Sequence, residues 1–354
     1  MYGAALYYPP LFCYLSLRHK SSYLKRAALT YGRLALGIGI GVGLGWFAIR
    51  GLDWGLVVDH LARVSPLMIA LALAVFMASG VVRAARWRML FVEPRPSVAR
   101  LFIVQHEGLG LSNIMPLRVA SELTQIAVLT IKDGLRATTV LAAIGMERAV
   151  DFISSMLIFG IAFMLVPEMR PLAPYVMGTI GLGVVLIGTL QVLAWRGESL
   201  WLVRRITFLV AFSNALRNLA QDWKLLLRVF AVSIAYWLMV GVSAWIASDA
   251  IGLPISPLTA TLVIIGTIFF ATAIPAPSGI GTFHFAVVFV LGLVDVAKDD
   301  AFPFAVIVHL LFFAPPTIIM AFFLPREGIS WKRAGGEQKV EPIEGGHEGD
   351  AQSR

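Results

Sequence analysis

Long apolar segments recur along almost the whole chain, and they constrain its fold more than any other feature. Hydrophobic residues make up 58% of the 354 residues and charged residues only 14%, and the mean hydropathy is +0.80. Because a helix needs about 20 apolar residues to cross a bilayer, we predict an all-α, polytopic integral membrane helical bundle of about eight spans. The predicted spans are residues 34–49, 66–82, 138–166, 172–194, 229–247, 258–274, 280–296 and 301–324.

Little sequence remains outside these spans. We predict a cytoplasmic N-terminal segment (1–33), a transmembrane domain (34–324) and a tail (325–354) whose Gly and mixed charges indicate disorder. The first apolar segment could be a signal peptide, but no small-residue cleavage site follows it, so we favour an uncleaved span.

The net charge of +8 follows the predicted topology. Lys and Arg cluster before the first span, after the second and after the fourth, and they are sparse in the loops between. Cytoplasmic loops of membrane proteins are enriched in Lys and Arg. We therefore predict a multi-pass protein of the cytoplasmic (inner) membrane with both termini in the cytoplasm. The basic residues form no contiguous stripe, so we expect no nucleic-acid partner.

Several kinds of chemistry lack their usual residues in this sequence. Cys13 is the single cysteine, which excludes an intramolecular disulfide or a multi-cysteine metal site. His284 and His309 do not have the spacing of a metal motif, and no nucleotide-binding loop or nucleophile motif is evident. We therefore predict no cofactor, no metal site and no ATP-driven pumping by this chain alone.

The stretch 101–131 is the first of two places where the chain is broken at membrane depth. It lies between two basic clusters and is interrupted by Ser112, Asn113 and Pro116. We predict a hairpin that enters and leaves the bilayer on the cytoplasmic side, with Pro116 shaping its turn.

The second break lies near the other end of the chain and carries no charge. Pro275, Pro277, Gly279 and Gly281 interrupt it, and we predict that they shape a second hairpin. Broken backbone in a bilayer must be buried in protein or line a watery cavity. Paired broken segments in opposite halves also indicate inverted repeats around a midplane site. Two ordinary kinked helices are the alternative.

Glu147, Arg148 and Asp151 lie inside a predicted span. On a helix they fall within an arc of about 100°, so we predict that all three face one cavity. Each charge costs about 2.5 to 3.5 kcal/mol at a helix centre. Pairing of Arg148 with Asp151 would offset part of this cost and leave one negative charge on Glu147. A buried strut between helices is an alternative role, and both roles can hold together.

Arg83, Arg86 and Trp87 lie at the predicted cytoplasmic end of the second span. The planar guanidinium fork suits phosphate, so these residues are candidates for recruiting an anionic lipid headgroup, with Trp87 as an interfacial anchor. The alternative is that the cluster is only a topology signal.

Asn113, Glu122 and His284 complete the candidate cavity residues. Asn113 can bond exposed backbone near the first turn. Glu122 needs a partner or a proton in lipid. His284 could act as a pH-sensitive gate or bond a neighbouring helix.

Four motifs, taken together, resemble a known family. They are Arg83-Ala-Ala-Arg86-Trp87-Arg88-Met89-Leu90, then Asn113-Ile-Met-Pro116 with Ser121-Glu122, then Glu147-Arg148 with Asp151, and Pro275 with Gly279-Ile-Gly281. In this order they resemble the lysylphosphatidylglycerol synthase transmembrane-region family of flippase-like integral membrane proteins, over about residues 34–324. The resemblance implies movement of a lipid or a lipid-linked headgroup between the leaflets of the cytoplasmic membrane.

The sequence departs from the family pattern at two places. Gln125 stands where the family commonly has Arg, and Phe283 with His284 stand where it commonly has an Arg-Glu pair. The departures put the cargo and any proton coupling in doubt. Aminoacyl-lipid synthases of this family carry a soluble catalytic domain after the membrane region, and only about thirty residues follow Leu324, so we expect no aminoacyl transfer.

We therefore predict a non-enzymatic transporter whose partners are membrane lipids, anionic or lipid-linked. One alternative is a transferase acting on a polyprenyl-linked sugar, with Glu122 or Glu147 as its acid or base. Another is a noncatalytic scaffold that binds lipid-synthesis enzymes, for example in hopanoid synthesis. The cargo, direction, energy coupling and oligomeric state stay open.

Overall fold

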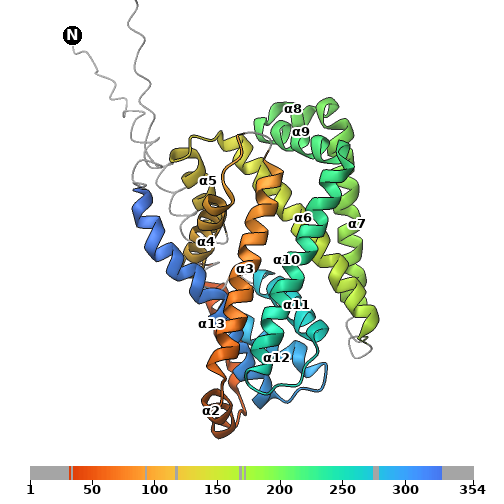
Figure 1. Ribbon diagram of the computed structural model, residues 1–354. Coiled ribbons are helices and arrows are strands. Elements are labelled where there is room, and N and C mark those ends of the chain that lie inside the picture. Colours follow the sequence, from red (N-terminus) through yellow and green to blue (C-terminus); the bar gives the residue numbers. More distant parts are fainter. Residues whose placement is uncertain are drawn as a thin grey trace, which may run out of the picture.

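The structure is a computed structural model that describes residues 32, 35–91, 94–115, 119–166, 170, 173–273 and 279–328. Within this part of the chain all regular structure is helical (Figure 1). A first helix, Ala35–Ile49, precedes the labelled elements. These are α2 (Trp54–Ala62), α3 (Pro66–Leu90), α4 (Val98–Ile114), α5 (Ala120–Ile131), α6 (Ala137–Leu165), α7 (Ala173–Arg196), η2 (Gly197–Ser199), α8 (Trp201–Arg205), α9 (Thr207–Gln221), α10 (Trp223–Asp249), α11 (Pro257–Ala273), α12 (Thr282–Gly292), α13 (Lys298–Phe323) and η4 (Leu324–Glu327).

Four of the described helices are long and apolar enough to cross a membrane: α3, α6, α10, and α13 with its continuation into η4. The first helix and α2 give a fifth span if this pair, bent by 88°, counts as one. A helix of 25 residues is about 38 Å long, more than the hydrocarbon core of about 30 Å. The protein is thus an all-α polytopic membrane protein, as predicted, and the number of eight spans stays a prediction.

One predicted span near the C-terminus needs correction. The predicted residues 258–274 match α11, of 17 residues, whereas the predicted residues 280–296 contain α12, of only 11 residues. The 11 residues of α12 extend only about 16 Å, because Gly281 ends the break that precedes it and α12 stops at Gly292. These segments thus form a hairpin of one helix of the predicted length and one that is shorter.

The order of element lengths repeats in the two halves of the chain. A long helix, α3, is followed by the short pair α4 and α5 and by the long helix α6. In the same way the long α10 is followed by the short pair α11 and α12 and by the long α13. Helices α3 and α10 pack along each other and run in opposite directions (Figure 1). This order supports the predicted inverted repeat.

The first hairpin breaks where the sequence predicts a break, since α4 ends at Ile114 and α5 begins at Ala120. Pro116, assigned to its turn, lies outside the described residues. α4 also packs closely on α13: a Cβ added at Gly110 would overlap the carbonyl oxygen of Pro316. α13 packs against α12 as well, so this helix contacts both hairpins.

Polar side chains cap several helices and fix where they begin. The Asp53 carboxylate accepts a hydrogen bond from the backbone N–H of Gly55, and Ser97 and Asp222 cap α4 and α10 in the same way. Such caps satisfy N–H groups that the helix leaves without partners.

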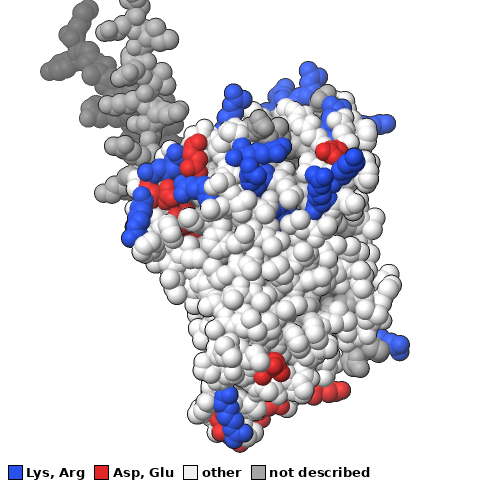
Figure 2. Space-filling view, in the orientation of Figure 1, with Lys and Arg blue, Asp and Glu red and all other residues white. Residues whose placement is uncertain are grey.

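On the face seen in Figure 2, an uncharged belt separates two charged ends of the molecule. Figure 2 shows Lys and Arg gathered at the end where α8 and α9 lie, whereas carboxylates are prominent at the opposite end, near α2. Large apolar side chains are exposed in the helices between, for example Leu182 at 59% and Met164 at 85%. Exposed apolar surface on this scale is typical of a protein solvated by lipid.

The second hairpin depends on glycine at its break. Gly279 and Gly281 have φ angles of 63° and 86°, which residues with a Cβ rarely adopt. A Cβ added at Gly281 would also overlap the carbonyl oxygen of Gly41 in the first helix. Pro275 and Pro277, which we expected to shape the same break, lie outside the described residues.

We expect Gly281→Ala to destabilise the protein by about 1 to 3 kcal/mol, because the left-handed backbone becomes strained and the first helix must move away from the hairpin. Thermal unfolding of the purified protein in detergent measures this loss. The control is Gly292→Ala, since an added Cβ there meets no atom within 4 Å. Equal melting temperatures for the two variants would show that the close approach at Gly281 does not matter.

Candidate functional site

A buried cluster of four charged side chains lies between α3 and α6. The Arg83 guanidinium donates to Glu147 at 2.8 Å, and Arg86 donates to Asp151 at 2.5 Å and to Glu147 at 3.3 Å. Arg83 and Arg86 are three residues apart in α3, and Glu147 and Asp151 are four apart in α6. These spacings place the two arginines on one face of α3 and the two carboxylates on one face of α6. Arg86 is 0% exposed and Glu147 only 1%. We call these four residues the ion cluster.

Helix α10 of the second half completes the ion cluster. Arg86 donates a hydrogen bond to the Ser233 hydroxyl at 2.6 Å. The ring of Tyr236 lies 5.8 Å from the Arg83 guanidinium carbon and 5.6 Å from that of Arg86, within the range of cation–π attraction. The ion cluster therefore sits where the two halves of the chain meet.

The structure corrects the predicted pairing within α6. Arg148 does not pair with Asp151; it donates to Glu122 of α5 at 2.7 Å, while Asp151 pairs with Arg86. Arg148 lies about 100° round the helix from Glu147, so it faces the first hairpin while Glu147 faces α3. The expectation that all three α6 charges face one cavity is therefore wrong.

The expected surface position of the α3 residues is also wrong. Arg83 and Arg86 are buried within the ion cluster, and Trp87 is fully buried against Phe91 and Val104 in an apolar cluster. Trp87 is not an interfacial anchor. The two arginines can be buried because Glu147 and Asp151 of α6 pair with them, and a buried charge is tolerated only where it is paired.

Glu122 and Arg148 link the first hairpin to the long helix that follows it. Their side chains are 28% and 43% exposed, far more than those of the ion cluster. Glu122 is the third residue of α5, which begins at Ala120, and Arg148 is the twelfth residue of α6, which begins at Ala137. We call this ion pair the first latch.

His284 and His309 form the corresponding contact in the second half. Their ring nitrogens are 3.4 Å apart. His284 is the third residue of α12, which begins at Thr282, and His309 is the twelfth of α13, which begins at Lys298. They occupy the same positions in their repeat as Glu122 and Arg148 in theirs, and we call this pair the second latch.

Aromatic rings surround the second latch. His309 lies 4.1 Å from Phe313 and 5.1 Å from Phe283 between ring centroids, and His284 lies 5.9 Å from Phe302. The expected bond of His284 to a neighbouring helix is confirmed, and its role as a gate stays a prediction.

Asn113 connects the first hairpin to α13. Its amide nitrogen donates to the carbonyl oxygen of Phe313 at 3.1 Å and to the Thr317 hydroxyl at 3.0 Å. We expected Asn113 to bond exposed backbone near the first turn. It does bond a backbone carbonyl, but that carbonyl belongs to α13.

Three functional candidates were missed by sequence reasoning. Ser233 and Tyr236 looked like ordinary residues of an apolar span. Glu107 in α4 is 0% exposed, and neither of its carboxylate oxygens has a hydrogen-bond partner among the residues that the structure describes. Its acidic side chain within an apolar stretch is the signal that could have found it. Among the described residues, no group of three or more His, Cys, Asp or Glu could hold a metal ion.

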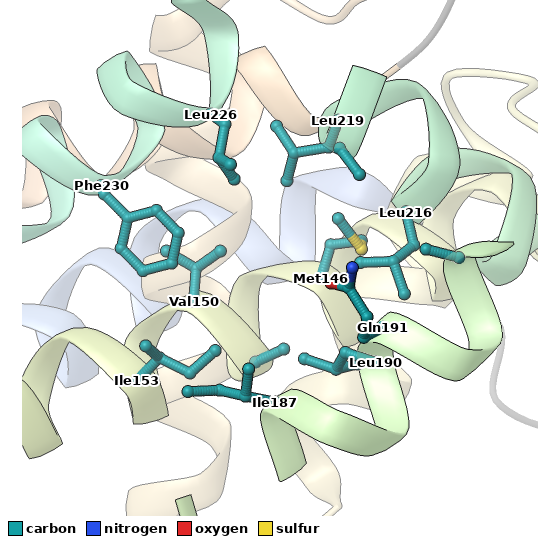
Figure 3. Close-up of a pocket in the computed structure, with 13 residues that line it drawn as sticks. Met146, Val150, Ile153, Ile187, Leu190, Gln191, Leu216, Leu219, Leu226 and Phe230 are labelled. Carbon is teal, nitrogen blue, oxygen red and sulfur yellow. The ribbon is translucent and has the colours of Figure 1, made fainter. Parts of the chain in front are cut away.

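An apolar pocket of about 210 Å³ lies on another side of α6 (Figure 3). Helices α6, α7, α9 and α10 form it, and none of the charged α6 residues lines it. The lining residues are Met146, Ala149, Val150, Ile153, Ile187, Leu190, Gln191, Ala194, Leu216, Leu219, Ala220, Leu226 and Phe230.

Comparison with known proteins identifies the family. The sequence model described as the lysylphosphatidylglycerol synthase TM region matches residues 34–319. No curated protein and no solved structure matches the chain. The match covers most of the sequence, so the chain belongs to the lysylphosphatidylglycerol synthase transmembrane-region family, and the resemblance carried by the four motifs is confirmed.

Proposed function

We propose that this family member is a secondary transporter that moves a lipid or a lipid-linked headgroup between the leaflets of the cytoplasmic membrane. The observation that carries the proposal is the ion cluster, which lies buried where α3 and α6 of one half meet α10 of the other. Charged residues at membrane depth mark substrate pathways, and transporters with inverted repeats bind substrate between the repeats.

The ion cluster offers a phosphate the donors that it prefers. Two guanidinium groups can bind phosphate oxygens through paired hydrogen bonds. In the structure Glu147 and Asp151 occupy these donors. A headgroup phosphate that enters would replace one carboxylate with another anion, so the arginines would stay paired throughout. Anionic lipids and lipid-linked phosphates are therefore the proposed cargo and partners.

The two latches would control access from opposite ends. The first latch joins α5 to α6, directly beside Glu147 of the ion cluster, and the second joins α12 to α13. Opening one while the other stays closed would expose the ion cluster to one leaflet at a time. Movement of one repeat against the other is the usual basis of alternating access.

The charge distribution sets the proposed orientation. The end with α8 and α9 carries most of the Lys and Arg seen in Figure 2, and such residues favour the cytoplasmic side. The first hairpin lies toward this end (Figure 1). The first latch would then face the cytoplasm and the second the opposite side, with both chain termini in the cytoplasm.

Transport fits the described carboxylates better than an enzymatic role does. A general acid or base must reach its substrate, yet Glu147 is 1% exposed and bonded to Arg83, and Glu122 is bonded to Arg148. We therefore prefer the transporter to the transferase.

Redistribution of headgroup-labelled lipid in proteoliposomes tests the proposal. We expect wild type to accelerate movement of labelled phosphatidylglycerol over protein-free vesicles. Arg83→Lys keeps the charge but loses the guanidinium fork. Loss of one charge-assisted hydrogen bond, about 1.5 to 3 kcal/mol, should slow transport roughly 10- to 100-fold.

The control for this experiment is Arg63→Lys, because the Arg63 side chain, just after α2, is 76% exposed and pairs with Asp59 of α2. It should transport at the wild-type rate. Full activity of Arg83→Lys would remove the ion cluster from the pathway. No redistribution of any anionic or zwitterionic lipid by wild type, with lipid synthesis in cells still dependent on the chain, would favour the scaffold.

A further inference from the structure

The apolar pocket opens beside the long helices, away from the ion cluster. On α6 the lining residues Met146 and Val150 lie about 100° round the helix from Glu147 and Asp151. The pocket also reaches the surface, since Ile187 is 48% exposed. It is therefore a second site, distinct from the proposed transport pathway.

The pocket lies directly beneath the interfacial layer of the basic end. Amphipathic α9 lies across this end of the bundle (Figure 1) and lines the pocket with Leu216, Leu219 and Ala220. Trp201 and Trp223 flank α9 and are 66% and 65% exposed, as expected for residues at headgroup depth.

The size and lining of the pocket limit what can fill it. A volume of about 210 Å³ leaves room for several water molecules. Water needs two to four polar partners to stay in such a space, and Gln191 is the polar residue of the lining. A hydrocarbon chain needs no polar partner, and it gains close van der Waals contact with the apolar side chains of the lining.

The position of Gln191 indicates which end of a bound lipid would face the basic end of the protein. It lies five residues before the end of α7 at Arg196, about 7 to 8 Å below that end, and Figure 3 shows its side chain among the apolar lining. A phospholipid whose headgroup sits at that end would bring its ester groups to about this depth, where their carbonyl oxygens could accept from the Gln191 amide. The Lys and Arg of the same end (Figure 2) complement a phosphate above it.

We infer that this pocket binds one hydrocarbon chain of an anionic phospholipid from the leaflet at the basic end. The chain lies against Val150, Leu190 and Phe230, the ester group bonds to Gln191, and the headgroup stays among the basic residues. The site holds a resident lipid whether or not the protein transports one.

Photocrosslinking tests this site. The protein is reconstituted into vesicles of phosphatidylethanolamine and phosphatidylglycerol that contain a phosphatidylglycerol with a diazirine in one acyl chain. After irradiation, peptide mass spectrometry maps the adducts. We expect adducts concentrated on residues 146–153 and 187–194. Adducts spread evenly over the lipid-facing helices would overturn the inference, as would equal labelling from a matched phosphatidylethanolamine probe.

A filling variant gives the decisive comparison. Ala220→Phe places a ring in the pocket, and Ala149→Phe does so from α6 if the first variant does not fold. Both should lose the concentrated adducts. The control is Ala235→Phe on the exposed face of α10, which should retain them. Adducts that persist in a folded filling variant would contradict the site. Headgroup redistribution measured separately in the same variants keeps this result apart from the test of transport.

Discussion

Replacing Arg86 with glutamine is expected to destabilise the protein by about 3 to 5 kcal/mol, because removing one partner leaves a buried charge uncompensated. Arg86 is fully buried and bonds Asp151, Glu147 and Ser233. Without it, two carboxylates of α6 share the remaining guanidinium of Arg83. We expect a melting temperature lowered by on the order of 10 °C, measured on purified protein in detergent.

The double variant Arg86→Gln with Asp151→Asn separates stability from transport. It removes one charge of each sign, so the ion cluster stays neutral, and we expect most of the lost stability to return. Transport should be lost in the single and the double variant alike, because both lack the second guanidinium. Recovery of both properties would show that Arg86 is a structural strut. A single variant as stable as wild type would show that the pairing is not what holds α3 against α6.

Hydropathy was sufficient to predict the fold class, and Pro, Gly and Asn residues within apolar stretches predicted both breaks in the chain. The helices are interrupted next to Asn113 and Gly281, as predicted. Such residues within an apolar stretch are informative because a bilayer tolerates unpaired backbone only in a few protected places. Hydropathy did not show that α12 is short, since the apolar character of the sequence continues through Gly292 into the following loop. Within a long apolar stretch, a helix begins or ends where the backbone leaves helical geometry, as it does at Gly281.

The charged residues of the site could be found from the sequence, but their partners could not. Spacing gives the direction of a side chain round its own helix, and it does not say which helix lies there. From its spacing, Arg148 could therefore pair with Asp151. In the structure its partner is Glu122 of α5. Ser233 and Tyr236 were missed for the same reason, because only the packing of α10 on α3 brings them to the arginines.

The two departures from the family pattern gain a structural meaning from the latches. Gln125, where relatives commonly have Arg, donates to Ser121 within α5 at 3.2 Å, and the cation that pairs with Glu122 comes instead from α6. His284, where relatives commonly have Glu, meets His309. One latch is thus an ion pair and the other a pair of imidazoles in an aromatic surrounding, so the two ends of the proposed pathway differ in chemistry although they match in position.

Breaking the first latch should slow transport strongly with little loss of stability. Glu122 and Arg148 are partly exposed, and such a pair contributes only about 0 to 1 kcal/mol to folding. If the latch closes the pathway toward the basic end, Glu122→Gln or Arg148→Gln leaves that end unable to seal. We expect each variant to melt near the wild-type temperature and to lower headgroup redistribution about 10-fold or more, a change of at least about 1.4 kcal/mol in the barrier.

The charge-reversed double variant, Glu122→Arg with Arg148→Glu, decides whether the ion pair itself matters. The same two positions would again carry opposite charges, so redistribution should recover well above either single variant. The matched control is Arg63→Gln with Asp59→Asn, which removes an exposed ion pair of α2 and should leave the rate unchanged. If the reversed pair stays as inactive as the single variants while folding normally, then Glu122 or Arg148 acts on the cargo directly and the first latch is not a gate.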